Sequence, residues 1–150
     1  ISLYGLYPSD EVRKSTITLT PALTWKARLV HLKQVPAGFH VSYGMTHRTA
    51  KPTTIATVPV GYGDGYSRLL SNQGTMLVGG LRAPIVGRVC MDLTMLDVGH
   101  IPDVTVDDEV VILGRQGNEA VTADEIAGVL GTINYEVVTA ISARVQRIFL

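Results

Sequence analysis

Residues 76–98 read MLVGGLRAPIVGRVCMDLTMLDV, and this stretch decides the fold class. Two apolar runs, 76–78 and 81–86, flank the pair Gly79-Gly80, and two glycines in that position are typical of a two-residue β-hairpin. A third apolar run at 89–98 predicts another strand. The stretch therefore predicts antiparallel β-structure at the centre of the chain.

Further strands are expected on both sides of this hairpin. From Leu23 to Leu29, apolar residues alternate with Thr24, Lys26 and Arg28, which is the period of a half-buried strand. The phase slips at Val30 and the apolar set continues at Leu32, which suggests a bulge. The other segments expected to be strands are 1–5, 39–43, 53–60, 109–113 and 140–150.

One helix is expected. Thr122 and Glu125 have the spacing of a capping box, apolar residues follow at helical spacing from Ile126, and Gly131 is a suitable C-terminal stop. Many short strands with turn signals and one helix predict a mainly β fold. We expect a single antiparallel barrel- or sandwich-like domain with one short helix near 123–131.

Composition narrows the class of protein. The 150 residues include 13 Lys+Arg and 13 Asp+Glu, a balance that argues against a nucleic-acid binder or attraction to an anionic membrane. No apolar run is long enough to span a bilayer, and no signal peptide is visible. The single cysteine, Cys90, cannot form an internal disulfide and fits a reducing compartment. A chain that opens at Ile1 rather than Met suggests a piece of something longer.

Two patterns could carry chemistry, and each has a structural alternative. The loop GYGDGY (61–66) has neither dinucleotide-binding nor P-loop spacing, so it is a turn or a functional loop. The run 88–92 mixes charge into an apolar strand, which fits an edge strand or a strand end that faces a ligand. Cys90 is more often an inert thiol than a nucleophile. The four histidines lack metal-ligand spacing, and no metal site is expected.

Three tyrosines, Tyr43, Tyr62 and Tyr135, stand beside Gly or Asn at expected strand ends. The ordinary pKa of a tyrosine is near 10. A tyrosine that takes part in proton transfer therefore needs a nearby positive charge to favour the phenolate, or must act as an acid.

Several runs taken together resemble one family. In chain order they are VSYG (41–44), VPVGYGDGY (58–66), APIVGRVCMD (83–92), GRQG (114–117) and TINYE (132–136). They look like the C-terminal β domain of alanine racemase, and the resemblance covers nearly all of residues 1–150. The opening LYG (3–5) and the closing RIF (147–149) are similar to the ends of that domain.

The resemblance implies a fold and an activity. Alanine racemases join a pyridoxal 5'-phosphate (α/β)8 barrel to this β domain, and they interconvert L- and D-alanine, a step of D-alanine biosynthesis for peptidoglycan precursors. The expected partners are alanine, the N-terminal barrel and a second subunit in a cytoplasmic head-to-tail homodimer, with no nucleic acid or membrane. The lysine that carries the cofactor lies in the barrel, so the isolated chain is expected to be inactive.

The resemblance also assigns roles to single residues. Tyr43 matches the tyrosine base that the β domain supplies to the partner's active site. Met91 matches the residue whose backbone N–H contacts the substrate carboxylate, with Cys90 and Asp92 on either side. Tyr135 and the backbone of Ile1 match contacts to the cofactor phosphate. The remaining matches line the entrance: Tyr62, Arg68 and Arg88. His47 departs from the family, which often has an aromatic residue there.

Two other readings stay open. The first is the β domain of a fold-related amino-acid decarboxylase, in which a cysteine approaches the cofactor, a role that Cys90 could take. The second is a non-catalytic β dimerisation module.

Overall fold

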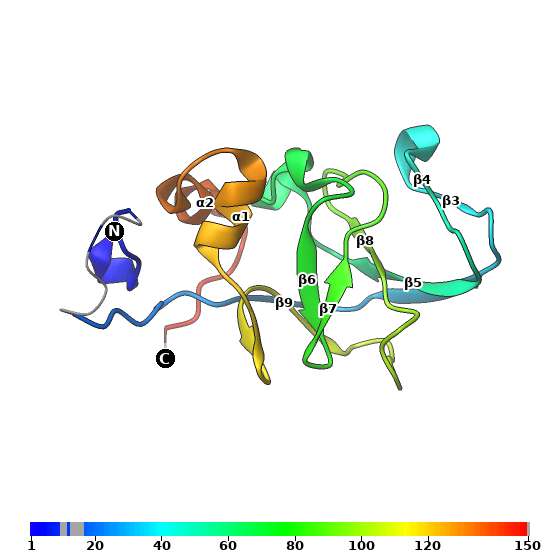
Figure 1. The fold of residues 1–150 in the computed structure, drawn as a ribbon, viewed down its shortest axis with the longest axis horizontal. Helices are drawn as coiled ribbons and strands as arrows, with labels where there is room; N and C mark the ends of the chain where they lie inside the picture. The colour runs from blue at the N-terminus through cyan, green and yellow to red at the C-terminus, as the bar shows by residue number, and fades with distance from the viewer. Residues whose placement is uncertain (10–11, 13–16, 150) are drawn as a thin grey trace.

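A computed structural model describes residues 1–9, 12 and 17–149. The fold is mainly β, as the sequence predicts (Figure 1). The strands are β1 (Trp25–Arg28), β2 (His31–Val35), β3 (His40–Val41), β4 (His47–Arg48), β5 (Thr53–Val58), β6 (Thr75–Val78), β7 (Leu81–Pro84), β8 (Thr94–Asp97), β9 (Glu109–Gln116) and β10 (Glu119–Val121). The helices are α1 (Ala123–Leu130) and α2 (Asn134–Ala140), with short 3-10 turns η1 (Ser2–Tyr4), η2 (Tyr43–Met45), η3 (Tyr62–Asp64) and η4 (Arg68–Leu70).

The strands form three antiparallel sheets. The largest has the order β1-β9-β6-β7, with β10 also paired to β9; the second is β2-β5-β8 and the third is β3-β4. One bridge between Ile85 and Leu96 joins the two larger sheets at an edge. Over the described ranges the strands do not pair continuously around the domain, so the expected barrel is not closed.

The core lies where β6 and β9 cross the domain. Met76, Leu77 and Val78 are consecutive and fully buried, and so are Val110 and Val111 opposite them. Successive side chains of a strand point to opposite faces, so both faces of these strands are covered. The hairpin between β6 and β7 forms as predicted, because Gly79 and Gly80 both adopt positive φ, which this turn requires.

The predicted helix is confirmed as α1. The Thr122 side-chain oxygen accepts a hydrogen bond from the Glu125 N–H at 3.1 Å, and Gly131 ends the helix with a φ of 70°. The Glu125 carboxylate pairs with Arg82 at 2.6 Å, which ties α1 to β7. No helix in the described residues is long and apolar enough to cross a membrane.

Several sequence expectations are wrong in detail. The segment 140–149 is not a strand: α2 occupies 134–140, and Arg147 donates hydrogen bonds to the carbonyls of Ile141, Ser142 and Val145, which hold a turn. Leu150 lies outside the described residues. Segment 1–5 contains a 3-10 turn, and segment 39–43 is a strand only at 40–41.

The chain also changes sheet where a bulge was expected. The Leu29 N–H donates to the Asp108 carbonyl, and the next N–H, of Val30, donates to the Thr57 carbonyl, each at 3.0 Å. Segment 23–32 is therefore split between β1 in one sheet and β2 in the other. In segment 89–98 only β8 is a strand, because the Cys90 N–H bonds to the Leu93 carbonyl at 2.9 Å and closes a turn.

Candidate functional site

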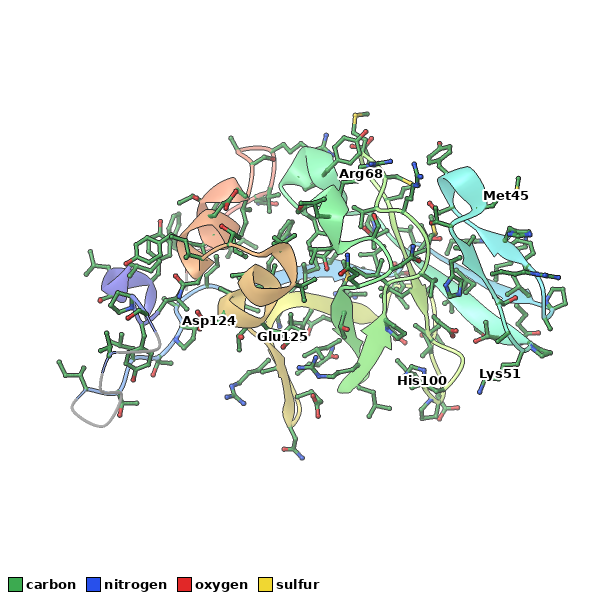
Figure 2. All side chains as sticks on the ribbon, turned by 45° about the horizontal axis from the view of Figure 1, so that its top comes forward. Met45, Lys51, Arg68, His100, Asp124 and Glu125 are labelled. Carbon is green, nitrogen blue, oxygen red and sulfur yellow. The ribbon has the colours of Figure 1, made fainter. Side chains whose placement is uncertain are left out.

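Three loops from distant parts of the sequence meet at a cavity of about 430 Å³. The loops carry η2, the segment from η3 to η4, and the turn that precedes β8. The cavity brings together five of the seven residues expected at the site, and its full lining is Tyr43, Tyr62, Arg68, Arg88, Val89, Cys90, Met91, Asp92 and Leu93. Figure 2 shows Arg68 and Met45, the last residue of η2, on the same upper side of the molecule.

Tyr43 is presented to solvent on a strained backbone. Its side chain is 75% exposed, and the residues on either side of the pair 43–44, Ser42 and Met45, have φ angles of 64° and 50°. Residues other than glycine rarely adopt positive φ, and such strain of about 1–3 kcal/mol persists only where the surroundings hold it. Here the Ser42 hydroxyl donates to the Arg88 carbonyl at 2.8 Å.

Gly87 allows this close approach. A Cβ at Gly87, whose φ is 80°, would lie 2.6 Å from the Ser42 Cβ. The Gly87 N–H donates to the Asn72 side-chain oxygen at 2.6 Å, and the Asn72 amide donates to the Thr46 hydroxyl at 3.2 Å. Asn72 therefore holds the Gly87 turn and the loop after Tyr43 together.

The glycine-rich loop packs directly on the Met91 turn. The N–H groups of Tyr62 and Gly63 donate to the carbonyls of Cys90 and Met91, at 3.0 and 2.8 Å. A Cβ at Gly61 would lie 2.2 Å from the Cys90 oxygen, so only glycine fits there. Met91 lines the cavity, and no hydrogen bond within the described residues uses its N–H.

Among the described residues, some charged side chains at the cavity form ion pairs and others do not. Within residues 1–9, 12 and 17–149, neither Arg68 nor Arg88 makes an ion pair. Asp92 also lines the cavity, but it pairs with Arg144, which bonds Asp64 at 2.7 Å as well. The hydrogen bond to Asp64, and to a smaller extent that to Asp92, raises the pKa of the Arg144 guanidinium above its ordinary value. Two unpaired guanidinium groups suit an anionic ligand.

The other two expected residues lie elsewhere. Tyr135 is in the first turn of α2 and is 37% exposed, and Ile1 precedes η1 and is half-buried. The Asn134 amide donates to the Tyr7 carbonyl at 3.0 Å, which ties α2 to the segment after η1. In Figure 1, α2 and η1 lie towards one end of the long axis, whereas β3 and β4, on either side of η2, lie at the other.

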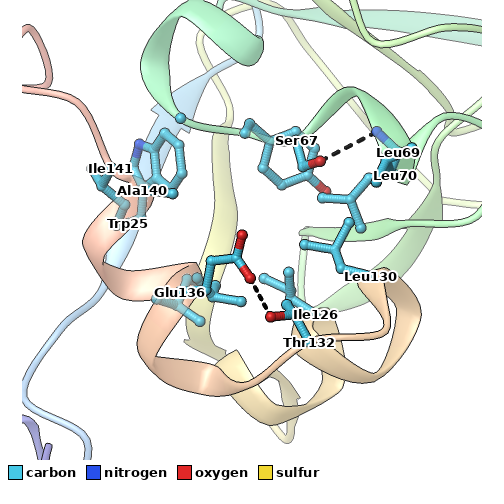
Figure 3. Close-up of a pocket in the computed structure, with 14 residues that line it drawn as sticks. Trp25, Ser67, Leu69, Leu70, Ile126, Leu130, Thr132, Glu136, Ala140 and Ile141 are labelled. Atoms are coloured by element: carbon cyan, nitrogen blue, oxygen red, sulfur yellow. Dashed lines mark hydrogen bonds between the residues drawn. The ribbon is translucent and has the colours of Figure 1, made fainter.

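Another cavity, of about 120 Å³, lies between the helices and η4, and Figure 3 shows it as mostly apolar. Its polar lining includes Glu136, whose carboxylate accepts a hydrogen bond from Thr132, and Tyr66. Burial raises the pKa of Tyr66 well above its ordinary value, and the negative charge of Glu125 adds to this effect. The phenol therefore stays neutral. None of the expected site residues lines this cavity.

Arg144 is the residue that the sequence patterns missed: it does not line the cavity of about 430 Å³, the main cavity of the site, but it bonds Asp92, which does. The alternation after position 140 placed it on a strand, whereas it follows α2 and reaches two loops. A partial signal was present, because Asp92 is a charge within an apolar run and an acid in that setting calls for a cationic partner. Nothing in the spacing points to a partner 52 positions away. Among described residues, no three His, Cys, Asp or Glu side chains group as metal ligands.

The fold and cavity define a mainly β domain whose loops assemble a small cavity that two arginines, Arg68 and Arg88, help to line. The chain belongs to the alanine racemase family: the model of the family's C-terminal domain matches residues 22–149. It is 59% identical over 149 residues to alanine racemase from Desulfosudis oleivorans, and 56% identical over 147 residues to that from Halothermothrix orenii. These alignments cover 99% and 98% of this chain, and 38% of each relative.

Solved structures agree. A crystal structure of alanine racemase from Bacillus anthracis with bound L-Ala-P matches with a TM-score of 0.93 and 46% identity over 99% of this chain. Alanine racemase from Clostridium difficile in complex with cycloserine matches with a TM-score of 0.88 and 46% identity over 95% of this chain. This chain covers 38% and 37% of those two chains, so it spans well under half of the proteins that it matches.

Proposed function

We propose that residues 1–150 form the C-terminal domain of a pyridoxal 5'-phosphate-dependent alanine racemase that works in the cytoplasm as a homodimer. In this proposal Tyr43 transfers the proton on one face of the alanine Cα, and the barrel's lysine serves the other face. The observation that carries the proposal is the exposed Tyr43 at a cavity with two arginine side chains and a backbone N–H, that of Met91, none of which has an ion-pair or hydrogen-bond partner among the described residues.

Besides Tyr43, four residues of the cavity have a task in the proposed reaction. The Met91 N–H binds the substrate carboxylate, and Arg68 and Arg88 attract that anion into the cavity. Arg88 also packs on the Gly44 backbone, since a Cβ there would lie 3.3 Å from the guanidinium carbon. This contact places a positive charge beside the segment that carries Tyr43. Tyr62 narrows the entrance.

Tyr135 fits the cofactor phosphate. Its phenol is partly exposed on α2, and no hydrogen bond within the described ranges uses its hydroxyl, so it is free to donate to a phosphate oxygen. The Ile1 N–H is the second proposed phosphate donor. When bound there, the cofactor would supply the electron-withdrawing group that makes the Cα proton removable. The residues described here hold and orient the reactants and move the proton.

Tyr135 and Ile1 lie apart from Tyr43, and this separation supports an active site to which two subunits contribute. Tyr135 and Ile1 belong to the end of the domain with α2 and η1, and Tyr43 belongs to the other end (Figure 1). One domain with two separated sets of site residues suits a head-to-tail dimer. The first set serves the barrel of its own subunit, and Tyr43 serves the partner's barrel.

Tyr43→Phe in the full-length enzyme tests the role of Tyr43. We expect exchange of the Cα hydrogen with solvent deuterium to slow by about 10²- to 10⁴-fold for one alanine enantiomer, and far less for the other. Tyr62→Phe is the matched control, because it removes a hydroxyl from the same cavity and should slow neither exchange strongly. Equal slowing of both enantiomers by Tyr43→Phe would argue against a base that serves one face.

The isolated chain should be inactive, since in the family the lysine that carries the cofactor lies in the barrel. Purified residues 1–150 with added pyridoxal phosphate should racemise alanine no faster than the free cofactor does. Turnover above that background would contradict this part of the proposal.

One observation keeps the decarboxylase reading as a second candidate. Cys90 lines the cavity, with its sulfur 3.6 Å from the Ser42 hydroxyl. Release of carbon dioxide from amino acids by the full-length enzyme, without racemisation of alanine, would favour that reading.

A further inference from the structure

Arg144 joins two loops of the main cavity from outside. Its Nε donates to Asp64 at 2.7 Å, and its Nη2 donates to Asp92. Asp64 is in η3, directly after the Tyr62-Gly63 pair, and Asp92 directly follows Met91. One guanidinium therefore holds the two loops that supply Tyr62 and the Met91 N–H. Its planar fork allows it to bond both carboxylates at once.

The Asp64 carboxylate depends on this partner. Its side chain is only 13% exposed, and its other oxygen accepts the Gly61 N–H at 2.9 Å. A carboxylate taken largely out of water is costly unless it is paired and hydrogen-bonded. Among the described residues, loss of Arg144 would leave this charge with the Gly61 N–H alone, at the base of the loop that carries Tyr62.

Arg144 is itself held by the end of α2. The Ser142 N–H donates to the Asp64 carbonyl at 2.9 Å, and three hydrogen bonds from Arg147 to nearby carbonyls hold the turn that presents Arg144. The guanidinium also lies close to the glycine-rich loop, because a Cβ at Gly63 would be 3.0 Å from its Nη2. The turn after α2 and two walls of the cavity are thus connected through one side chain.

We propose that Arg144 is a positioning residue of the site: by bonding Asp64 and Asp92 together, it keeps the Tyr62 loop and the Met91 turn at the spacing that binds the substrate carboxylate. Arg144 also pairs with Asp92. Without that pair, the Asp92 carboxylate, which lines the cavity, would compete with the substrate carboxylate for Arg68 and Arg88. The inference rests on the proposed racemase function and adds a residue to it.

The chain offers a matched control in Arg82. This arginine also bonds two carboxylates, Glu119 at 2.9 Å and Glu125 at 2.6 Å, and its side chain is 42% exposed against 49% for Arg144. Its partners lie on β10 and α1, and none of the three residues lines the main cavity. Figure 2 shows Glu125, a residue of α1, well apart from Arg68. Loss of Arg82 should affect stability and leave substrate binding unchanged.

The test measures alanine racemisation by full-length Arg144→Gln, Arg144→Lys and Arg82→Gln. Arg144→Gln should raise KM for alanine about tenfold and leave kcat within about threefold, because the lost contacts act on binding. Arg144→Lys should recover only part of the loss, since an ammonium lacks the fork that bridges two carboxylates. Arg82→Gln should leave KM unchanged while it lowers the thermal midpoint.

The double variant Asp92→Asn with Arg144→Gln adds a second check. Each change breaks the same ion pair, between Asp92 and Arg144, so their effects on KM should not add. A wild-type KM in Arg144→Gln, or an equal rise in KM from Arg82→Gln, would overturn the inference. If the wild-type enzyme does not racemise alanine at all, the proposed function fails instead.

Discussion

The main cavity and the β6–β9 part of the large sheet differ in the burial of their side chains and in the regularity of their backbone. In the sheet, consecutive residues such as Leu77 and Val78 are fully buried and the backbone follows regular antiparallel pairing. At the cavity, large side chains are exposed, Tyr43 by 75% and Met91 by 53%, and the backbone next to Tyr43 has positive φ.

The difference indicates where stability and function reside. Burial of apolar side chains stabilises the sheet. The cavity exposes apolar surface and holds strained backbone, both of which cost stability, and glycines and side-chain hydrogen bonds keep it in place. We therefore expect substitutions in the sheet to reduce stability and substitutions at the cavity to reduce activity.

Leu77→Ala should have the largest effect on stability. It removes a fully buried side chain from β6 and should cost about 2–5 kcal/mol. Amide hydrogen exchange of β9 in the full-length protein measures this loss. Leu81→Ala, at a 42% exposed position of the same hairpin, is the control and should cost under about 1.5 kcal/mol. Equal losses would mean that β6 is not the centre of the core.

Gly87→Ala should affect both regions. Its φ of 80° strains any side chain, and the new Cβ would collide with Ser42, so we expect a loss of about 2 kcal/mol. The displaced Tyr43 should also lower the racemisation rate by roughly 10²-fold. Gly128→Ala, in the helix α1 with open space around it, should stabilise the protein by about 0.5–1 kcal/mol. Full activity of Gly87→Ala would contradict the close approach described here.

Arg82→Gln should have the smallest effect, and that effect should depend on pH. Hydrogen bonds from Arg82 hold the pKa of Glu125 below its ordinary value of 4.5. A carboxyl with a lowered pKa in the folded state stabilises the protein above its unfolded pKa, and this stability is lost as pH falls through the folded pKa. The variant should be about 1 kcal/mol less stable near pH 7, since exposed pairs contribute little.

Below pH 4.5 the difference between Arg82→Gln and the wild type should shrink, as measured by thermal midpoints across pH. A constant difference at every pH would show that Arg82 acts through packing rather than through its charge.

Local patterns in the sequence predict the regular elements well. The glycine pair at 79–80 predicts the central hairpin, and Thr122 and Gly131 bracket α1, because turns and caps depend on a few neighbouring residues. Helix α2 was not predicted, because Val137, Val138 and Thr139 are β-branched and the alternation after 140 favours a strand. Its position depends on tertiary contacts, such as the hydrogen bond from Asn134 to the Tyr7 carbonyl.

The cavity could not be derived from spacing alone. Its residues come from three loops, so no local period relates Tyr43, Tyr62 and Arg88. The resemblance of short motifs to a known family singled them out, and the structure brings them together. Arg144 shows the limit of both approaches, because it belongs to none of the quoted motifs and only the folded chain places it next to Asp64 and Asp92.

The most direct test of the central claim mixes two inactive full-length variants. One carries Tyr43→Phe, and the other lacks the cofactor lysine of the barrel. If Tyr43 serves the partner's barrel, each mixed dimer contains one site with both groups intact, and racemisation should reappear after the subunits exchange. If Tyr43 serves its own barrel, every site in a mixed dimer lacks one group, and persistent inactivity of a verified mixed dimer would contradict the account.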